Sequence, residues 1–204
     1  MKKQAGLLAM ITPVWFVGVY LFMSSLRPRY SHLTRAISEL GTLDAPHGVY
    51  WNVLGYVLTG LAIAVLGLGM KNEFTPLARK SRWPACALML SGLFMTLSGI
   101  FPGDLAHRTS LTTTMHLVGS FGSYVAFLVA GLWFPVYFRK NPGWRMFFWP
   151  SLILVVASLL TGVLRQGDMP GLGQRLTFAC YFGWIFLAGL RLYKRNAARL
   201  PSHR

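Results

Sequence analysis

Six long apolar stretches, separated by short polar breaks, constrain the fold of this chain more than any other feature. They lie near residues 6–25, 49–70, 85–102, 114–138, 147–164 and 176–194. A helix needs roughly 20 apolar residues to cross a hydrocarbon layer about 30 Å thick, and each stretch approaches that length. The sequence therefore predicts an all-α fold, a polytopic bundle of six transmembrane helices in which residues 1–204 form one integral membrane domain.

The overall composition supports a membrane location. Hydrophobic residues make up 54% of the chain and charged residues only 12%, against roughly 25% charged residues in soluble domains. The net charge of +15 would fit a nucleic-acid partner, because clustered Lys and Arg neutralise phosphates. Here the basic residues occupy short runs between apolar stretches, where they act as topology signals. We therefore expect membrane lipid as a partner and no nucleic acid.

The distribution of basic residues predicts the orientation of the bundle. Fourteen fall on one side of the predicted helices: Lys2, Lys3, Lys71, Arg79, Lys80, Arg82, Arg139, Lys140, Arg145, Arg191, Lys194, Arg195, Arg199 and Arg204. Six fall on the other side: Arg27, Arg29, Arg35, Arg108, Arg165 and Arg175. Short cytoplasmic loops retain Lys and Arg, so the first side is predicted to be cytoplasmic. We expect a multi-pass protein of the cell (inner) membrane with both termini in the cytoplasm.

The predicted outer side carries most of the residue types that bind ligands, coordinate metals or move protons. It holds four of the five acidic residues and four of the five histidines: Glu39, Asp44, Asp104, Asp168, His32, His47, His107 and His116. All the lysines fall on the cytoplasmic side. A functional site is therefore expected to open on the outer side.

The longest outer segment, residues 27–41, contains apolar residues at helical spacing. Leu33, Ile37 and Leu40 share one face, while polar side chains lie elsewhere. This pattern predicts a short amphipathic helix between the first two spans that ends at Gly41 and lies in the outer interface. A simple connector that caps the bundle is the alternative.

Polar residues also form stripes on the predicted spans. Ser120 and Ser123 follow His116 by four and seven residues, so the three share one helix face. On the second span Asn52 shares a face with Thr59. Such stripes should face the bundle rather than lipid. Hydrogen bonding and close packing between helices would produce the same pattern.

Ionisable residues at a membrane boundary are costly and therefore indicate function. We interpret Glu39, Asp104 and His116 as candidate acid–base or metal groups, and Asp104, His107 and His116 as the ligands if a metal binds. Candidate ligand-binding residues are Ser38, Asn52, Arg165 and Arg175, since arginine can clamp phosphate or carboxylate. A structural ion-pair network would look the same in sequence. The residues identify no particular cofactor.

A family resemblance rests on several short motifs. They are Tyr30-Ser31-His32, Ile37-Ser38-Glu39-Leu40-Gly41, Asn52, the Phe-Pro-Gly-Asp end of the third span at Asp104, His116 and Gly173-Gln174-Arg175. This pattern resembles the bacterial and archaeal membrane family catalogued as domain of unknown function 998. The resemblance implies a six-helix membrane fold and brings no activity, substrate or cofactor.

Three functions are compatible with this sequence. In the first, the protein binds or processes a lipid or other amphiphile at a polar cavity on the outer face. Alternatively, it serves as a non-catalytic subunit that packs against another membrane protein, or as a small proton-coupled transporter in which Asp104 and His116 change protonation.

Overall fold

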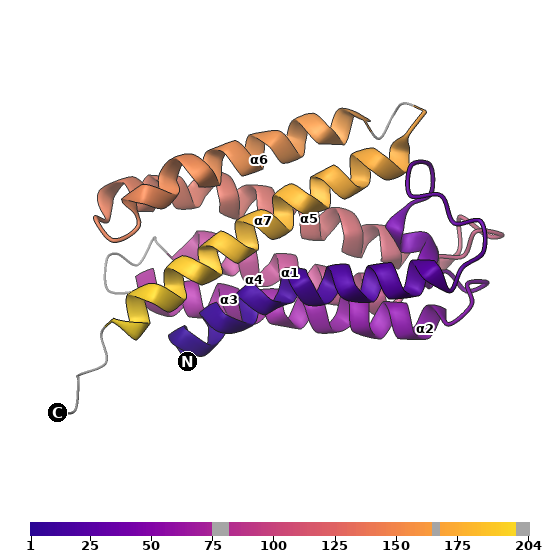
Figure 1. Cartoon of the computed structure of the whole chain (residues 1–204), viewed down its shortest axis with the longest axis horizontal. Coiled ribbons are helices and arrows are strands. Elements are labelled where there is room, and N and C mark those ends of the chain that lie inside the picture. The colour runs from indigo at the N-terminus through magenta and orange to yellow at the C-terminus, as the bar shows by residue number, and fades with distance from the viewer. Residues whose placement is uncertain (75–81, 165–167, 199–204) are drawn as a thin grey trace.

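The computed structural model describes residues 1–74, 82–164 and 168–198, and these form helices without any strand. Figure 1 shows an elongated bundle in which α1 begins and α7 ends at the same end. We call this the terminal end. The opposite end carries residues 26–47 and 101–110, and we call it the loop end.

Six helical spans are long and apolar enough to cross a membrane, as the sequence predicts. They are α1 (Lys2–Ser25), the continuous helix Gly48–Phe74, α4 (Arg82–Ile100), α5 (Leu111–Lys140), the span Arg145–Val163 and α7 (Pro170–Ala197). The fifth span joins the short 3₁₀ helix η4 (Arg145–Phe147) to α6 (Phe148–Val163). The chain is therefore a multi-pass membrane protein.

The sixth span begins six residues before the predicted start at 176, because its first turn is too polar to be recognised from hydropathy. Pro170 opens this helix, where a missing backbone N–H costs nothing and the fixed φ favours helix. Gly171, Gln174 and Arg175 are consequently helical residues of α7, not a loop.

The second span is irregular at the loop end. It consists of α2 (Gly48–Tyr50), a π-helical segment η2 (Trp51–Val57) and α3 (Leu58–Phe74). A π-helix carries an extra residue, which shifts side-chain directions and often occurs near functional sites. Within this segment Asn52 donates from Nδ2 to the Gly41 carbonyl at 2.7 Å, and the Leu54 carbonyl accepts from Trp15 Nε1 at 2.9 Å.

The outer segment contains a shorter helix than the sequence predicts. Only η1 (Ile37–Gly41), a 3₁₀ helix, forms, and Ala36 before it is extended. Ile37 and Leu40 are buried as expected, whereas Leu33 is 49% exposed. The reason is that carbonyls preceding η1 accept hydrogen bonds from α7: Leu172 N donates to Leu33 at 2.9 Å and Arg175 Nη1 to Arg35 at 2.9 Å. These contacts replace the local bonds of a helix.

Helix packing places α4 between α3 and α5, α1 against α3 and α7, and α6 against α5 and α7. Aromatic side chains fill much of the centre, including Trp184, Phe127 and Phe134, which are fully buried. These rings pack the centre of the bundle tightly.

Candidate functional site

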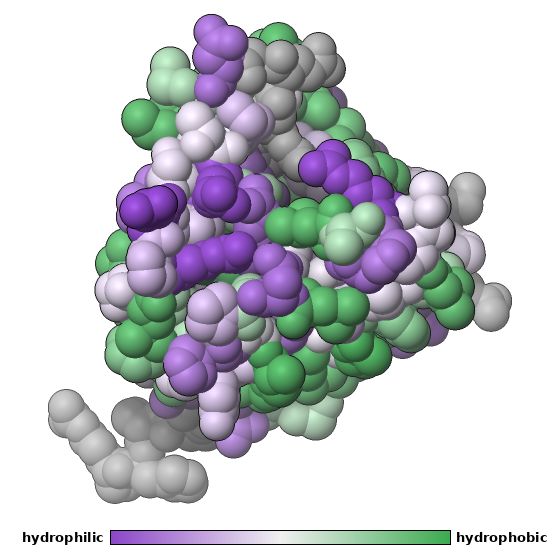
Figure 2. Space-filling view, turned by 90° about the vertical axis from the view of Figure 1, so that its right-hand side faces the viewer, coloured by the Kyte–Doolittle hydropathy of each residue, from purple (hydrophilic) through white to green (hydrophobic). Residues whose placement is uncertain are grey.

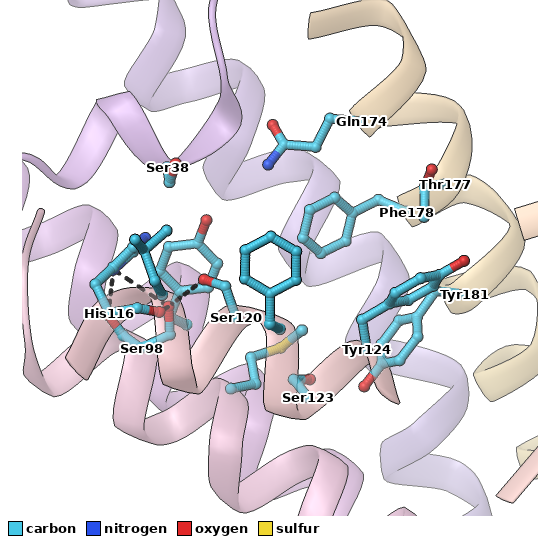
Figure 3. A pocket seen from close by; sticks show the side chains of 14 residues that line it. Ser38, Ser98, His116, Ser120, Ser123, Tyr124, Gln174, Thr177, Phe178 and Tyr181 are labelled. Atoms are coloured by element: carbon cyan, nitrogen blue, oxygen red, sulfur yellow. Dashed lines mark hydrogen bonds between the residues drawn. The ribbon is translucent and has the colours of Figure 1, made fainter. Parts of the chain in front are cut away.

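A cavity of about 120 Å³ lies near the loop end, between the first halves of α5 and α7. Figure 3 shows side chains of α5 and α7 on facing walls. The lining residues are Ser38, Tyr56, Met95, Ser98, His116, Leu117, Ser120, Phe121, Ser123, Tyr124, Gln174, Thr177, Phe178 and Tyr181. For scale, an apolar cavity of about 150 Å³ can hold a benzene molecule. The cavity is therefore large enough for a small polar group with its first few carbons.

Helical periodicity explains how one wall forms. His116, Ser120 and Ser123 on α5 lie at positions that share a helix face, and all three line the cavity. The expectation that this stripe faces the interior of the bundle is confirmed, since His116 and Ser123 are buried.

The facing wall comes from a stripe on α7 that the sequence analysis missed. Gln174, Thr177, Phe178 and Tyr181 follow the same spacing of three, four and seven residues. The spacing of these residues could be seen in the sequence, but Gln174 lay outside the predicted span, which began at residue 176. Tyr56 also lines the cavity and meets the His116 ring edge-on at 6.0 Å.

The imidazole of His116 is held in a defined orientation. Its Nδ1 lies 2.9 Å from the Ser98 carbonyl oxygen and 3.0 Å from that of Phe101. Because carbonyls only accept, Nδ1 carries the proton and Nε2 of the neutral ring is an acceptor. Among the described residues, the hydrogen bonds of this ring all involve Nδ1. A fixed imidazole with an available lone pair can accept a ligand proton or hydrogen bond.

Hydroxyl groups form two hydrogen-bonded sets at the cavity, one of which includes His116. Ser98 Oγ lies 2.8 Å from Ser120 Oγ, and Ser91 Oγ lies 2.9 Å from the Tyr181 hydroxyl. Ser91 also donates to the Ser123 carbonyl at 2.8 Å. The cavity therefore combines a few polar groups with an otherwise apolar lining, as small-molecule sites usually do.

The two predicted acidic residues Glu39 and Asp104 do not line the cavity. Glu39 pairs with Arg35 at 3.0 Å and accepts the Ala36 N–H at 2.9 Å, so it holds η1 in place. Asp104 caps its own turn, because its carboxylate accepts N–H groups of Ala106 and His107. The hydrogen bond from the His107 backbone is the main reason that the pKa of Asp104 is lowered.

The predicted metal ligands are not brought together. Asp104 Oδ2 contacts His107 Nδ1 at 3.2 Å, whereas His116 lines the cavity. In residues 1–74, 82–164 and 168–198, no group of three or more His, Cys, Asp and Glu side chains is placed to hold a metal ion.

Arg175 connects the outer segment to α7. Its guanidinium is already bonded to protein atoms, so it is not a free clamp for a headgroup. Its guanidinium donates to the hydroxyls of Tyr20 and Tyr30, both at 2.8 Å, and to the carbonyls of Arg35 and Gly171 at 2.9 and 2.7 Å. It also lies over both tyrosine rings. Burial raises the pKa of Tyr30 to about 12, although the nearby guanidinium opposes this shift.

The remaining predicted ligand-binding residues lie in different places relative to the cavity. Ser38 lines the cavity from η1. Asn52 is buried and holds the Gly41 carbonyl, outside the cavity lining. Arg165 lies outside the described residues. The structure thus brings together Ser38 and His116 from the predicted set, with Ser120 and Ser123 from the stripe.

Fold and cavity define the class: a six-span, all-helical membrane protein with a cavity of mixed polar and apolar lining toward one end. The chain belongs to the family described as "Protein of unknown function (DUF998)", whose model matches residues 10–191. This confirms the resemblance seen in the motifs. Comparison with curated proteins gave no match, and neither did comparison with solved structures.

Proposed function

We propose that this protein binds a membrane amphiphile in the cavity between α5 and α7. The supporting observation is the contrast between the cavity's interior and its rim. His116, Ser120 and Ser123 supply polar groups inside, whereas the lining residues Leu117 and Phe121 are 47% and 58% exposed on the flank of the bundle. A molecule with a polar head and an apolar tail matches both surroundings at once.

The cavity opens on the non-cytoplasmic side of the cell membrane in this proposal, and both termini lie in the cytoplasm. Support comes from the lysines, since Lys2, Lys3, Lys71, Lys140 and Lys194 all belong to the terminal end. Figure 2 looks onto the loop end, where hydrophilic residues gather beside a hydrophobic patch. The amphiphile then enters from the outer leaflet.

Mass spectrometry of molecules retained after purification in mild detergent tests the binding. We expect the wild-type protein to carry an amphiphile in a fixed molar ratio. Ser120→Phe should fill the cavity and lower that ratio to less than about half, because a well-packed site admits no further volume. Thr114→Phe, at an exposed position on the same helix, is the matched control and should retain the wild-type ratio.

Equal retention by the wild type and both variants would show that the amphiphile binds elsewhere. A folded wild-type protein that retains no amphiphile, and takes none up from added membrane extract, would contradict the proposal. That result would favour a role as an accessory subunit.

A further inference from the structure

Three described arginines at the loop end are paired with protein atoms. Arg35 forms an ion pair with Glu39 at 3.0 Å, and Arg175 makes its contacts to two tyrosines and two carbonyls. Arg27 donates to the Glu39 carbonyl. None of the described residues that line the cavity carries a formal charge at neutral pH when His116 is neutral. A charged headgroup placed there would lose water without gaining an opposite charge from any of these described lining residues, which is costly.

One cavity residue presents a hydrogen-bond acceptor. Two carbonyls fix the proton of His116 on Nδ1, so the lone pair of Nε2 is available to a donor. His116 is 6% exposed and lines the cavity. A ligand that donates a hydrogen bond can therefore be recognised at this point.

A second residue presents a donor. The backbone N–H of Ile37 donates to Gln174 Oε1 at 2.6 Å, which fixes the orientation of the amide. Its Nε2 group therefore remains the donor side, and Figure 3 shows this nitrogen turned toward the cavity. Gln174 and His116 come from α7 and α5 and line the same cavity.

Three other hydroxyls in the cavity wall, those of Tyr124, Thr177 and Tyr181, have already used their protons. Ser158 Oγ donates to the Val155 carbonyl at 2.7 Å, so Tyr124 must donate to Ser158 across 3.2 Å. Thr177 donates to the Gly173 carbonyl at 2.9 Å. By the same reasoning Tyr181 donates to Ser91, whose own proton goes to a carbonyl. These groups face a ligand as acceptors, which again favours a ligand that donates.

We propose that the bound amphiphile carries an uncharged hydroxyl as its polar group, an inference that rests on the proposed binding function. The hydroxyl donates to His116 Nε2 and accepts from Gln174 Nε2. Its first carbons contact Phe178, and the chain leaves the cavity past Leu117 and Phe121. The class comprises long-chain alcohols and other neutral lipids with a free hydroxyl, and excludes anionic headgroups.

Four probes with the same sixteen-carbon chain, roughly the length of a membrane lipid tail, test this assignment in nanodiscs of zwitterionic lipid. They are the primary alcohol, its methyl ether, the carboxylate and the phosphate monoester. We expect the alcohol to bind tightest, because the ether cannot donate and the two anions meet no opposite charge among the described lining residues. Loss of one hydrogen bond should weaken binding by about three- to tenfold.

Two variants separate the two hydrogen bonds. His116→Asn keeps a donor near the carbonyls of Ser98 and Phe101 but removes Nε2. It should therefore weaken binding of the alcohol and leave binding of the ether unchanged. Gln174→Leu removes the donor and should weaken binding of both the alcohol and the ether. Controls are His47→Asn, at an exposed residue with positive φ that asparagine tolerates, and Gln4→Leu, at an exposed residue of α1. Neither control should change binding.

Failure of the inference differs from failure of the proposed function. Binding of the phosphate or carboxylate as tightly as the alcohol would overturn the neutral hydroxyl assignment and leave amphiphile binding intact. So would alcohol binding that both variants leave unchanged. Absence of binding for every probe, together with no retained amphiphile, would remove the proposed function itself. If His116→Asn does not fold, the response of the alcohol and ether to Gln174→Leu still decides the case.

Discussion

Glu73 is a buried carboxylate at the terminal end that the sequence analysis did not single out. Its side chain is 2% exposed and pairs with Lys2 at 3.1 Å and Arg195 at 3.0 Å. The three residues come from α3, α1 and α7, so one carboxylate joins three helices. Its partners are distant in sequence, which is why spacing alone could not reveal this cluster.

Glu73→Gln should destabilise the protein, because two cations would lose their counterion. Fully buried pairs cost about 3–5 kcal/mol when broken, but Lys2 and Arg195 remain 28% and 19% exposed and can be hydrated. We therefore expect a loss of about 2 kcal/mol, measured as a lower Tm in detergent. Glu39→Gln, in the more exposed pair with Arg35, is the control and should change stability by less than about 1 kcal/mol.

Tyr30 gives a pH-dependent prediction at the loop end. Burial raises the pKa of Tyr30 to about 12 in the folded protein, whereas an unfolded tyrosine ionises near pH 10. The neutral hydroxyl is therefore favoured by folding, so its contribution to stability is complete below about pH 10 and is lost as pH approaches 12.

Thermal unfolding of Tyr30→Phe and the wild type between pH 8 and 12 should show this difference. The wild-type protein should lose stability more steeply above about pH 10, while the variant begins less stable because it lacks the contacts with Arg175 and Ala36. Tyr50→Phe, at an exposed tyrosine, controls for removal of a phenol. Parallel pH profiles for Tyr30→Phe and the wild type would contradict the assignment.

Helices α3 and α4 approach closely at a pair of glycines. A Cβ added at Gly60 would lie 2.5 Å from the Gly92 carbonyl oxygen, and one added at Gly92 would lie 2.5 Å from the Ala64 nitrogen. These neighbours are backbone atoms and cannot rotate away. Small residues at such crossings let transmembrane helices pack, since association in lipid depends on close contact.

Gly92→Ala should therefore lower stability by about 1–3 kcal/mol through overpacking, despite the better helix propensity of alanine. Gly18→Ala is the matched control, because a Cβ at Gly18 meets nothing within 4 Å. Thermal unfolding in detergent measures both. A neutral Gly92→Ala would mean that the crossing of α3 and α4 is looser than the structure shows.

How well the sequence predicts the helices differs from one helix to the next. Hydropathy located every span, because lipid requires a long apolar helix regardless of its neighbours. It missed the beginning of α7, where Gln174 and Arg175 make tertiary contacts. It also could not show the π-helical segment η2, where the Asn52 side chain and the Leu54 carbonyl form hydrogen bonds with other elements.

The orientation of the whole molecule remains a prediction from the lysines and arginines. A fluorescent protein fused after residue 204 should fold and fluoresce, because the predicted cytoplasmic side supports its maturation. An alkaline phosphatase fused at the same position should stay inactive, since it requires export. The reverse pair of results would place the cavity on the cytoplasmic face and reverse the proposed entry side.

The sequence by itself determined that this chain crosses the membrane six times, because span number depends on local runs of apolar residues. It also placed His116, Ser120 and Ser123 on one face, because helical spacing is a local property. Only tertiary structure decided which polar residues share the cavity. The cavity excludes Glu39, Asp104 and Arg175, which form hydrogen bonds with protein atoms outside it. The α7 residues, in contrast, line it together with His116. Such pairings join residues that are distant in the sequence, so residue spacing cannot predict them.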